Sequence, residues 1–299
     1  MSDHRFLELS ELLDPGDLVV VNETRVRAAR LIGHRSGTGG KVELFLLSKN
    51  ADGSWEAMAK PARRLREGVV IELDGLTATV LGKGHGLLTI SLDAEDGEAA
   101  VQEAGHVPLP PYFTGRLDDD ERYQTMFARK LGSAAAPTAG LHFTPEVVRR
   151  LEEKGIAMAT VDLQVSLDTF RPITTSTVED HQMHSEWCAV PPETARAVAQ
   201  AGRVIAVGTT VVRTLESFAA GPGVVEPGEK RTDLFLMPGS EFQVVDGLVT
   251  NFHMPGSTLL VLLAAFMGER WRETYETALE RGYRFLSFGD AMYAERERT

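Results

Sequence analysis

Short apolar runs rich in β-forming residues follow one another closely between Ala29 and Gly105. Turn sequences such as Asp52-Gly53 and Asp74-Gly75 separate the runs, and no helical pattern intervenes. The six runs are Arg30–His34, Val42–Ser48, Trp55–Lys60, Val69–Leu73, Leu76–Leu81 and Leu87–Leu92. Closely spaced strands of this kind predict a small antiparallel β-barrel.

On either side of these runs, helical and strand patterns alternate. Leu18–Val21 is a continuous aliphatic run, which is typical of a buried strand. Further strands are predicted at 157–165, 204–207, 232–237, 242–245 and 284–288, and helices at 7–13, 145–154, 193–201, 211–218, 258–267 and 271–280, with 219–229 as a surface loop. The alternation predicts an α/β fold. We expect an α/β domain made of residues 1–28 and 108–299, with the barrel, residues 29–107, inserted into it.

The composition is that of a soluble globular protein, with 43% apolar and 25% charged residues. One cysteine, Cys188, excludes an internal disulfide and predicts a cytoplasmic location. No apolar run approaches the ~18 residues that a membrane helix needs, so no membrane partner is expected. The N-terminus also lacks the basic start of a secretion signal.

The net charge of −12 argues against broad, nonspecific binding of nucleic acids, because affinity for phosphates comes from Lys and Arg. A local basic face is still compatible with that charge. The basic clusters are Lys60 with Arg63, Arg64 and Arg66, and the pair Arg129-Lys130. The ordinary interpretation of such runs is a solvated surface.

The stretch from Tyr123 to Phe143 combines a polar start, a run of small residues and a helix entry. Gly132–Ala136 are all small, which lets a ligand approach the backbone closely. Thr144 is the predicted N-cap of the helix that follows, and His142 lies just before it. By composition alone, a ligand site and a tightly packed loop are equally good interpretations of this stretch.

Familiar nucleotide and metal motifs are absent. Gly37–Lys41 resembles a phosphate loop but lacks the flanking residues, so a hairpin turn is the better interpretation. A single glycine, Gly208, follows its strand where a dinucleotide fingerprint needs several. His181, His184 and Cys188 have no paired second half for zinc, so no metal site is predicted.

Polar clusters lie at predicted strand ends and helix entries, where α/β proteins bind ligands. They are Met183–Glu186, Thr209–Arg213, Thr250–Thr258 and Arg284–Asp290. His184 with Glu186 suits proton transfer or ribose binding, and an ordinary surface pair is an equal alternative. Arg213 is either a ligand for an anion or the partner of Glu216 in a helical ion pair. Together the clusters favour an enzyme that binds a polar substrate without a metal or an obvious covalent nucleophile.

Stretches spread over nearly the whole chain resemble the S-adenosylmethionine:tRNA ribosyltransferase-isomerase family of queuosine biosynthesis. They are Asp17–Leu31, Thr38–Glu43, Lys60-Pro61, Pro108–Tyr112, Arg122–Thr125, Ala135–Phe143, Met183–Glu186, Val207–Ser217, Thr250–Leu260 and Tyr283–Met292. The most specific words are AAPTAGLHF, which ends at Phe143, and TNFHMPGSTLL, which begins at Thr250.

The resemblance implies a transferase and isomerase that moves the ribosyl part of S-adenosylmethionine onto 7-aminomethyl-7-deazaguanine at the wobble position of tRNA. The ribose is rearranged into an epoxycyclopentane, which gives epoxyqueuosine and releases adenine and methionine. S-adenosylmethionine is consumed as a substrate, so no metal or bound cofactor is implied. The implied partner is a tRNA with a GUN-type anticodon that carries the deazaguanine precursor, and a monomer or weak dimer is expected.

Site residues follow from the resemblance, position by position. His142, His184 and His253 are expected to transfer protons, and Glu186 and Asp290 to contact the ribose or the sulfonium. Arg25, Arg122, Arg213 and Arg284 are expected to hold the methionine carboxylate or tRNA phosphates. The other expected substrate-binding residues are Tyr112, Tyr123, Gln124, Thr138, Gly140, Thr209, Asn251 and Ser257.

The sequence departs from the family pattern in two places. Family members begin with a further Pro-rich segment containing a Ser-Arg-Leu-Leu-like stretch. Either the start codon is therefore misassigned, or the α/β domain is truncated at its N-terminus. The family's His-Val-Gly-x-Gly-Thr-Phe word reads QVSLDTF here, at Gln164–Phe170. Ser166 and Asp168 replace its two glycines, and their side chains would crowd a ligand that approaches the backbone. An active enzyme is the leading hypothesis. The alternatives are a noncatalytic or repurposed paralogue that binds tRNA or a nucleoside, and an enzyme for another S-adenosylmethionine-derived nucleoside.

Overall fold

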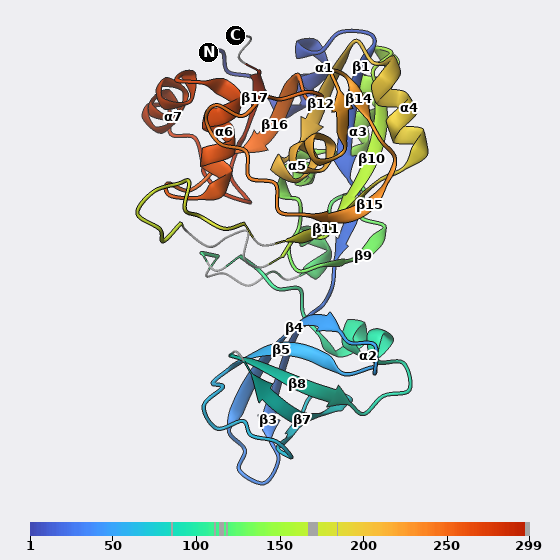
Figure 1. The fold of residues 1–299 in the computed structure, drawn as a ribbon, viewed down its shortest axis with the longest axis vertical. Coiled ribbons are helices and arrows are strands. Elements are labelled where there is room, and N and C mark those ends of the chain that lie inside the picture. The colour runs from blue at the N-terminus through green and yellow to red at the C-terminus, as the bar shows by residue number, and fades with distance from the viewer. Residues whose placement is uncertain are drawn as a thin grey trace. The chain divides into compact units, whose positions relative to one another are not determined.

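A computed structural model describes residues 1–84, 86–110, 112–113, 117, 119–166, 173–183 and 185–296. The chain divides into two compact units, one made of Met1–Arg25 and Arg122–Thr299 and the other of Val26–Glu121. The larger unit contains an α/β sheet and the smaller one a closed antiparallel barrel (Figure 1). The predicted fold class, an α/β domain with an inserted β-barrel, is confirmed.

A seven-stranded sheet forms the centre of the larger unit, in the order β15-β11-β10-β1-β12-β16-β17. The central strands are parallel, namely β10 (Ala157–Leu163), β1 (Asp17–Asn22), β12 (Arg203–Val207) and β16 (Gly247–Asn251). The outer strands β11 (Glu186–Val190), β15 (Gly228–Thr232) and β17 (Ala291–Glu295) pair antiparallel with their neighbours. The carboxyl ends of the four parallel strands therefore meet at one edge of the sheet.

Helices cover both faces of this sheet, and β1 shows why. Every residue of β1 is buried, which suits an aliphatic run in a parallel sheet. Val19 and Val21 pack on one face with residues of α1 (Leu9–Leu12) and α3 (Pro145–Glu153). Leu18 and Val20 join the core of the other face. That core includes residues of α4 (Pro192–Gln200), α5 (Thr209–Ser217), α6 (Thr258–Met267) and α7 (Arg270–Glu280).

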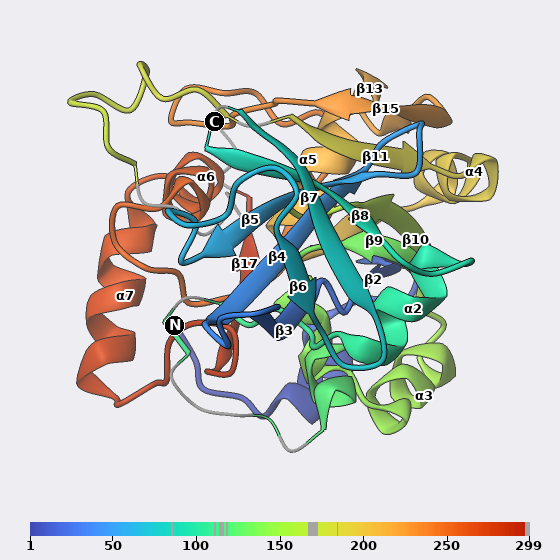
Figure 2. The same cartoon turned by 90° about the horizontal axis from the view of Figure 1, so that it is seen from below.

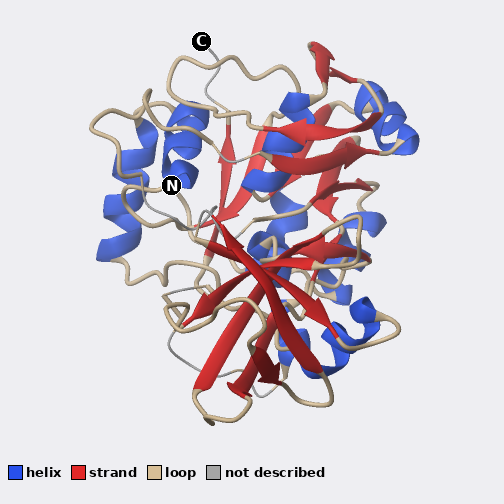
Figure 3. Cartoon of the chain, turned by 60° about the horizontal axis from the view of Figure 1, so that its bottom comes forward, coloured by secondary structure: helices blue, strands red, loops and turns tan. Residues whose placement is uncertain are grey.

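The smaller unit is a closed barrel, which Figures 2 and 3 show from two further directions. Its strands follow the order β3 (Arg30–Arg35), β4 (Lys41–Lys49), β5 (Trp55–Lys60), β8 (Leu87–Leu92), β7 (Thr77–Gly84) and β6 (Val70–Glu72). Alternate side chains point inward, as Val42, Leu44 and Leu46 do in β4. The strand pattern does not predict α2 (Gly97–Ala104), whose Val101 joins the barrel core.

The remaining elements are short. They are η1 (Phe6–Glu8), β2 (Thr24–Val26), η2 (Asp120–Tyr123), β9 (Lys130–Ser133), η3 (Thr138–His142), β13 (Ala219–Gly221) and β14 (Val224–Val225). Thr144 is the N-cap of α3, as predicted. Its Oγ1 accepts a hydrogen bond from Val147 N at 3.3 Å. In the described ranges, none of the helices combines the length and apolar character that crossing a bilayer requires.

Several strand boundaries in the last third of the chain are predicted wrongly. The expected loop at 219–229 contains the hairpin of β13 with β14 and the start of β15, and only Thr232 of the expected strand 232–237 lies in β15. The expected strands at 242–245 and 284–288 do not form, and β16 and β17 follow them instead. Val244 and Val245 are nevertheless buried, because an apolar run can fill a core without joining a ladder.

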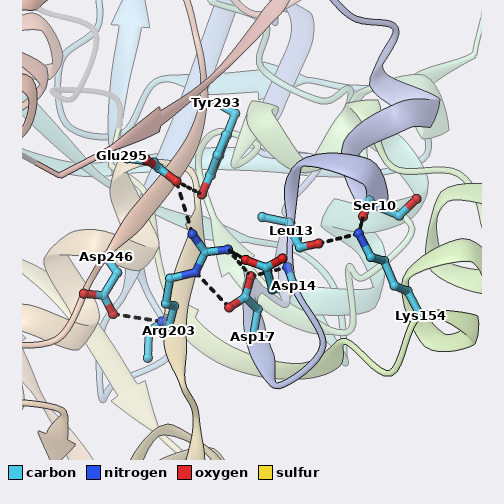
Figure 4. Close-up of polar contacts among 10 residues, drawn as sticks. Ser10, Leu13, Asp14, Asp17, Lys154, Arg203, Asp246, Tyr293 and Glu295 are labelled. Carbon is cyan, nitrogen blue, oxygen red and sulfur yellow. Dashed lines mark hydrogen bonds and ion pairs between the residues drawn. The ribbon is translucent and has the colours of Figure 1, made fainter.

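A charged network ties together the amino edge of the sheet (Figure 4). Arg203 begins β12 and donates to both carboxylate oxygens of Asp17, at 2.9 and 2.6 Å. Its other donors reach Asp14 and Glu295, both at 3.1 Å. Burial by itself raises the pKa of Asp17, but hydrogen bonds from Arg203 and the Asp14 amide reverse this, so the pKa lies below the ordinary 3.8. The network joins three strands at the edge opposite to the carboxyl ends of the parallel strands.

We expect Arg203→Met to lower the free energy of unfolding at pH 7 by about 2–3 kcal/mol, because it leaves the buried Asp17 carboxylate without its charged partner. A carboxyl whose pKa is lowered by folding stabilises the protein above pH ~4, and this contribution disappears as the pH falls through the folded-state pKa. The difference between the two proteins should therefore be largest at neutral pH and shrink below pH ~4. Urea denaturation at several pH values measures it, with Arg272→Met, at an exposed ion pair, as the control. An equal loss of unfolding free energy in Arg203→Met and Arg272→Met would contradict the stabilising role of the Arg203–Asp17 pair.

Candidate functional site

Polar side chains gather at the carboxyl edge of the parallel strands. Asn22 ends β1, and its Nδ2 donates to Leu163 O at 3.0 Å while its Oδ1 accepts from Leu163 N at 3.1 Å. The same Nδ2 lies 3.4 Å from Thr210 Oγ1, at the start of α5. The chain after β1 returns through α3 on one face, and the chain after β12 enters α5 on the other. Open α/β sheets bind ligands where connections diverge in this way.

A cavity of about 540 Å³ adjoins this edge in the larger unit. Its wall includes Phe6 of the N-terminal segment, Val249 of β16, Tyr293 of β17 and the turn that contains Arg284 and Asp290. It reaches the carboxyl edge because Ala291, which also lines it, pairs with the last residue of β16. Such a volume is that of a site for a small molecule.

His142 lies on the wall of this cavity, at the end of η3. Its ring stacks on Phe6, with centroids 5.1 Å apart and planes inclined by 26°. Its Nε2 lies 2.9 Å from Nδ2 of Asn251, the last residue of β16. Thr138 Oγ1 donates to Asn251 Oδ1 at 3.0 Å, so the hydroxyl orients the amide and the amide orients the imidazole.

These contacts favour neutral His142. An amide N–H directed at Nε2 requires a lone pair there, which assigns the ring proton to Nδ1. A second proton on Nε2 would face the amide N–H. Burial lowers the pKa of His142 below 6.5; the charge of Asp290 acts to raise it, and that of Arg284 to lower it. Among the described residues, the only hydrogen-bond partner of the His142 ring lies at Nε2, so Nδ1 is the nitrogen available to a ligand.

Asp290 and Arg284 form an ion pair in the turn that precedes β17. Arg284 Nη2 donates to Asp290 Oδ1 at 2.6 Å, and its backbone N donates to Oδ2 at 2.8 Å. The hydrogen bonds from Arg284 outweigh the effect of burial and hold the pKa of Asp290 below 3.8. The Arg284 side chain is 72% exposed. Asp290 thus presents a carboxylate that stays ionised at neutral pH.

We expect Asp290→Asn to lower the pKa of His142 further, because it removes the negative charge that raises this pKa and leaves the Arg284 cation that lowers it. NMR titration of the imidazole Cε1–H signal measures the change. Asp3→Asn is the control, since Asp3 pairs with Arg281 and Tyr283 instead. A wild-type pKa at or above 6.5, or one that Asp290→Asn leaves unchanged, would contradict this electrostatic picture.

His253, two residues after Asn251, is buried. Its Nε2 lies 2.9 Å from Thr250 Oγ1, and its backbone N donates to Tyr275 Oη at 2.8 Å. Burial lowers the pKa of His253 to about 4, so the imidazole is neutral at pH 7. It does not line the 540 Å³ cavity. Proton transfer by His253 stays a prediction, and here the side chain is a packed hydrogen-bond partner of Thr250.

Glu186 and Arg213, both expected to bind substrate, bind each other. Arg213 Nη1 pairs with Glu186 Oε2, and the two side chains are 5% and 2% exposed. Arg213 Nε donates to Leu234 O at 3.1 Å, and Glu186 Oε1 accepts from Ser166 N at 2.7 Å. Glu216, the alternative partner of Arg213, instead accepts three backbone N–H groups between Gln243 and Val245. The pair thus joins β11, α5 and the segment after β10.

The other expected substrate residues occupy different settings. Tyr123 is buried with its ring 5.8 Å from that of Phe288. A side chain at Gly140 would meet Thr125 Cγ2 at 2.9 Å, so close packing requires the glycine. Ser257 caps α6, accepting from Leu260 N at 3.3 Å.

Five further positions complete the set. Arg122 is exposed, Arg25 and Gln124 are half-buried, Thr209 is buried at the start of α5, and Tyr112 is half-buried in the smaller unit. His184 and residues 167–170 of the altered loop lie outside the described residues. The roles of all these residues stay predictions.

Two features of the site are missing from the sequence-based set. Phe6 supports the His142 ring, but nothing in its local pattern distinguishes it from a core residue. Asp162, near the end of β10, is buried, and its Oδ1 has no hydrogen-bond partner among the described residues. Burial raises the pKa of Asp162 to about 6, opposed by the charge of Lys130. A single carboxylate inside an otherwise uncharged strand is a signal that could have identified it.

Within the described residues, no group of three or more His, Cys, Asp and Glu side chains is arranged to hold a metal ion. A family model described as a queuosine biosynthesis protein matches residues 1–294.

Curated relatives named S-adenosylmethionine:tRNA ribosyltransferase-isomerase include proteins from Rubrobacter xylanophilus and Moorella thermoacetica. The first is 51% identical over 98% of this chain and 86% of the relative, and the second 46% identical over 97% and 88%. Among solved structures, that of an S-adenosylmethionine tRNA ribosyltransferase from Thermotoga maritima is 35% identical, covering 96% of this chain and 85% of that one, with a TM-score of 0.49.

Proposed function

The chain belongs to the queuosine biosynthesis protein family, and from that premise we propose that it is an S-adenosylmethionine:tRNA ribosyltransferase-isomerase. It transfers the ribosyl moiety of S-adenosylmethionine to 7-aminomethyl-7-deazaguanine at the wobble position of a tRNA with a GUN-type anticodon. The products are epoxyqueuosine in the tRNA, adenine and methionine. The reaction takes place in the cytoplasm, where this tRNA is available.

The observation that carries the proposal is a neutral, oriented imidazole beside an ionised carboxylate on the wall of one cavity. His142 is held by Asn251 and Phe6, and Asp290 lies close enough for its charge to affect the pKa of His142. The sulfonium of S-adenosylmethionine is cationic and acidifies the adjacent C–H bond. A carboxylate stabilises this cation, and a positioned imidazole can donate or accept a proton in the reaction.

Each group has a distinct task in this proposal. Asp290 faces the sulfonium, and the exposed Arg284 guanidinium binds the methionine carboxylate through donors that Asp290 does not use. His142 donates a hydrogen bond from Nδ1–H to a ribose oxygen. When the Asn251 amide is reversed, so that its Nδ2 donates to Thr138 Oγ1 and its Oδ1 accepts from Nε2–H, the imidazole is in its other neutral tautomer and Nδ1 is a base.

The test is a reaction of the purified protein with S-adenosylmethionine and a tRNA that carries the aminomethyl-deazaguanine precursor. Chromatography should detect adenine and methionine, and mass spectrometry should detect the added ribosyl group on the tRNA. A tRNA with guanine at the wobble position is the control, because it lacks the amine that accepts the ribosyl group. Binding of the precursor tRNA without adenine release would instead identify a noncatalytic tRNA-binding member of the family.

A further inference from the structure

An acidic protein that acts on tRNA must bind a polyanion of the same charge sign. The net charge of this chain is −12, so at long range it repels a polyanion. Binding to the phosphate backbone then depends on a local surface where cations are exposed and not already neutralised. The two basic clusters of the sequence are the candidates for such a surface, and the structure distinguishes them.

The cluster at Arg129-Lys130 is partly neutralised within the protein. Lys130 Nζ lies 2.8 Å from Glu23 Oε1, whose side chain is only 8% exposed. The hydrogen bond to Glu23 raises the pKa of Lys130, as expected for an ammonium that pairs with a carboxylate. A phosphate would have to compete with a nearly buried carboxylate for this lysine.

The other cluster lies on the loop between β5 and β6 of the barrel. Its cations are exposed, and no ion pair to a described carboxylate involves them; they are Lys60, Arg63, Arg64 and Arg66. Lys83, at the end of β7, is also exposed, and its Nζ donates to Ala62 O of this loop at 2.9 Å. We refer to these five residues as the basic loop. Two other arginines of the same unit are paired, Arg27 with Glu98 and Arg30 with Glu43.

The loop is held in place by the barrel beneath it. Leu65 lies between the arginines and is 1% exposed, as part of the barrel core. Leu65 N donates to Ala62 O at 3.3 Å, and Gly68 N donates to Val80 O of β7 at 2.8 Å. Because Leu65 points inward, its neighbours are directed to solvent. The cations are thus presented on an ordered backbone, which lowers the entropy cost of binding.

We propose that the basic loop is a docking surface for the phosphate backbone of the substrate tRNA. The inference rests on the proposed function for the identity of the polyanion, and on the exposed, unneutralised cations for the location of the contact. Arginine forks suit phosphate oxygens, and such contacts position a nucleic acid without reading its sequence. The basic loop therefore contributes affinity and register, and the cavity beside His142 contributes chemistry.

The test compares wild type with the triple variant Arg63→Gln, Arg64→Gln, Arg66→Gln. Affinity for the precursor tRNA is measured by fluorescence anisotropy at several salt concentrations. We expect the variant to bind on the order of 10- to 100-fold more weakly at low salt, with the slope of log K against log[salt] reduced by roughly 2–3. The KM for tRNA should rise, while kcat at saturating tRNA stays close to that of wild type.

A matched control removes the same charge elsewhere, with Arg149→Gln, Arg196→Gln and Arg272→Gln on exposed helix positions of the larger unit. Unchanged tRNA affinity and salt slope in the basic-loop variant, or an equal loss in the control, would overturn the proposal. If wild type binds tRNA through the basic loop but releases no adenine, the proposed function fails and the docking surface stands. If tRNA affinity is unchanged and binding to anionic lipid vesicles is lost, the basic loop serves a membrane surface instead.

Discussion

Replacement of His142 by alanine is expected to lower kcat for adenine release by about 10²–10⁴-fold, the range that a positioned acid or base contributes. The side chain lies on the cavity wall, and its orientation is set by Asn251 and Phe6. It is only half-buried, so the variant should fold with a thermal midpoint close to that of wild type. Single-turnover kinetics with saturating S-adenosylmethionine and precursor tRNA isolate the chemical step.

The matched control is His106→Ala, which removes a half-exposed histidine of the barrel unit and should leave kcat unchanged. Asn251→Ala keeps the imidazole but removes the amide that selects its tautomer. We expect this variant to lower kcat with little change in KM and to shift the acid limb of the pH–rate profile. Wild-type kcat in His142→Ala would exclude His142 from proton transfer.

The second large effect is on stability. Arg213→Met is expected to lower the free energy of unfolding by about 3–5 kcal/mol, because it removes Arg213, the charged partner of the buried Glu186 carboxylate. The two side chains are 5% and 2% exposed, and Arg213 also donates to the carbonyl of Leu234. Urea denaturation followed by circular dichroism measures the loss.

The double variant Glu186→Leu, Arg213→Met separates the pair from its surroundings. Replacing both charges by apolar groups should recover part of the stability, since the buried Glu186 carboxylate is then removed together with Arg213. Arg231→Met, at an exposed arginine of β15, is the control and should cost little. An Arg213→Met protein with wild-type stability but weak binding of S-adenosylmethionine would instead support the ligand role expected from the sequence.

Many residues of the candidate site can be predicted from short stretches of the sequence. Thr138, His142 and Asn251 are in two of the most specific words of the chain, and the structure joins them in one hydrogen-bonded series. Arg284 and Asp290 are six residues apart and pair within a single turn. Proximity in the chain, or a helix entry at the end of a strand, is enough to predict that such residues lie near a ligand.

The partners of other residues could not be predicted. Glu186 and Arg213 were assigned separately to a ligand, yet they form a buried pair across 27 positions of the chain. The same limit applies to Phe6, whose ring supports His142 from the other end of the sequence. The type of a charged or aromatic residue indicates what it can bind. Which residue it contacts depends on how the sheet and helices pack.

By itself, the sequence determined the β-barrel, the strands β1, β10 and β12, the helix entries and the family of this protein, because these follow from short-range periodicity, turn residues and specific words. Tertiary structure alone decided the strands β16 and β17 and the partner of each charged side chain. It also distinguished the exposed cations of the basic loop from the neutralised Lys130. The physical reason is that burial and ion pairing depend on residues far apart in the chain. An apolar run can fill a core either as a strand of a sheet or outside any sheet. An arginine side chain can pair with a carboxylate or remain in solvent. Packing decides between these alternatives.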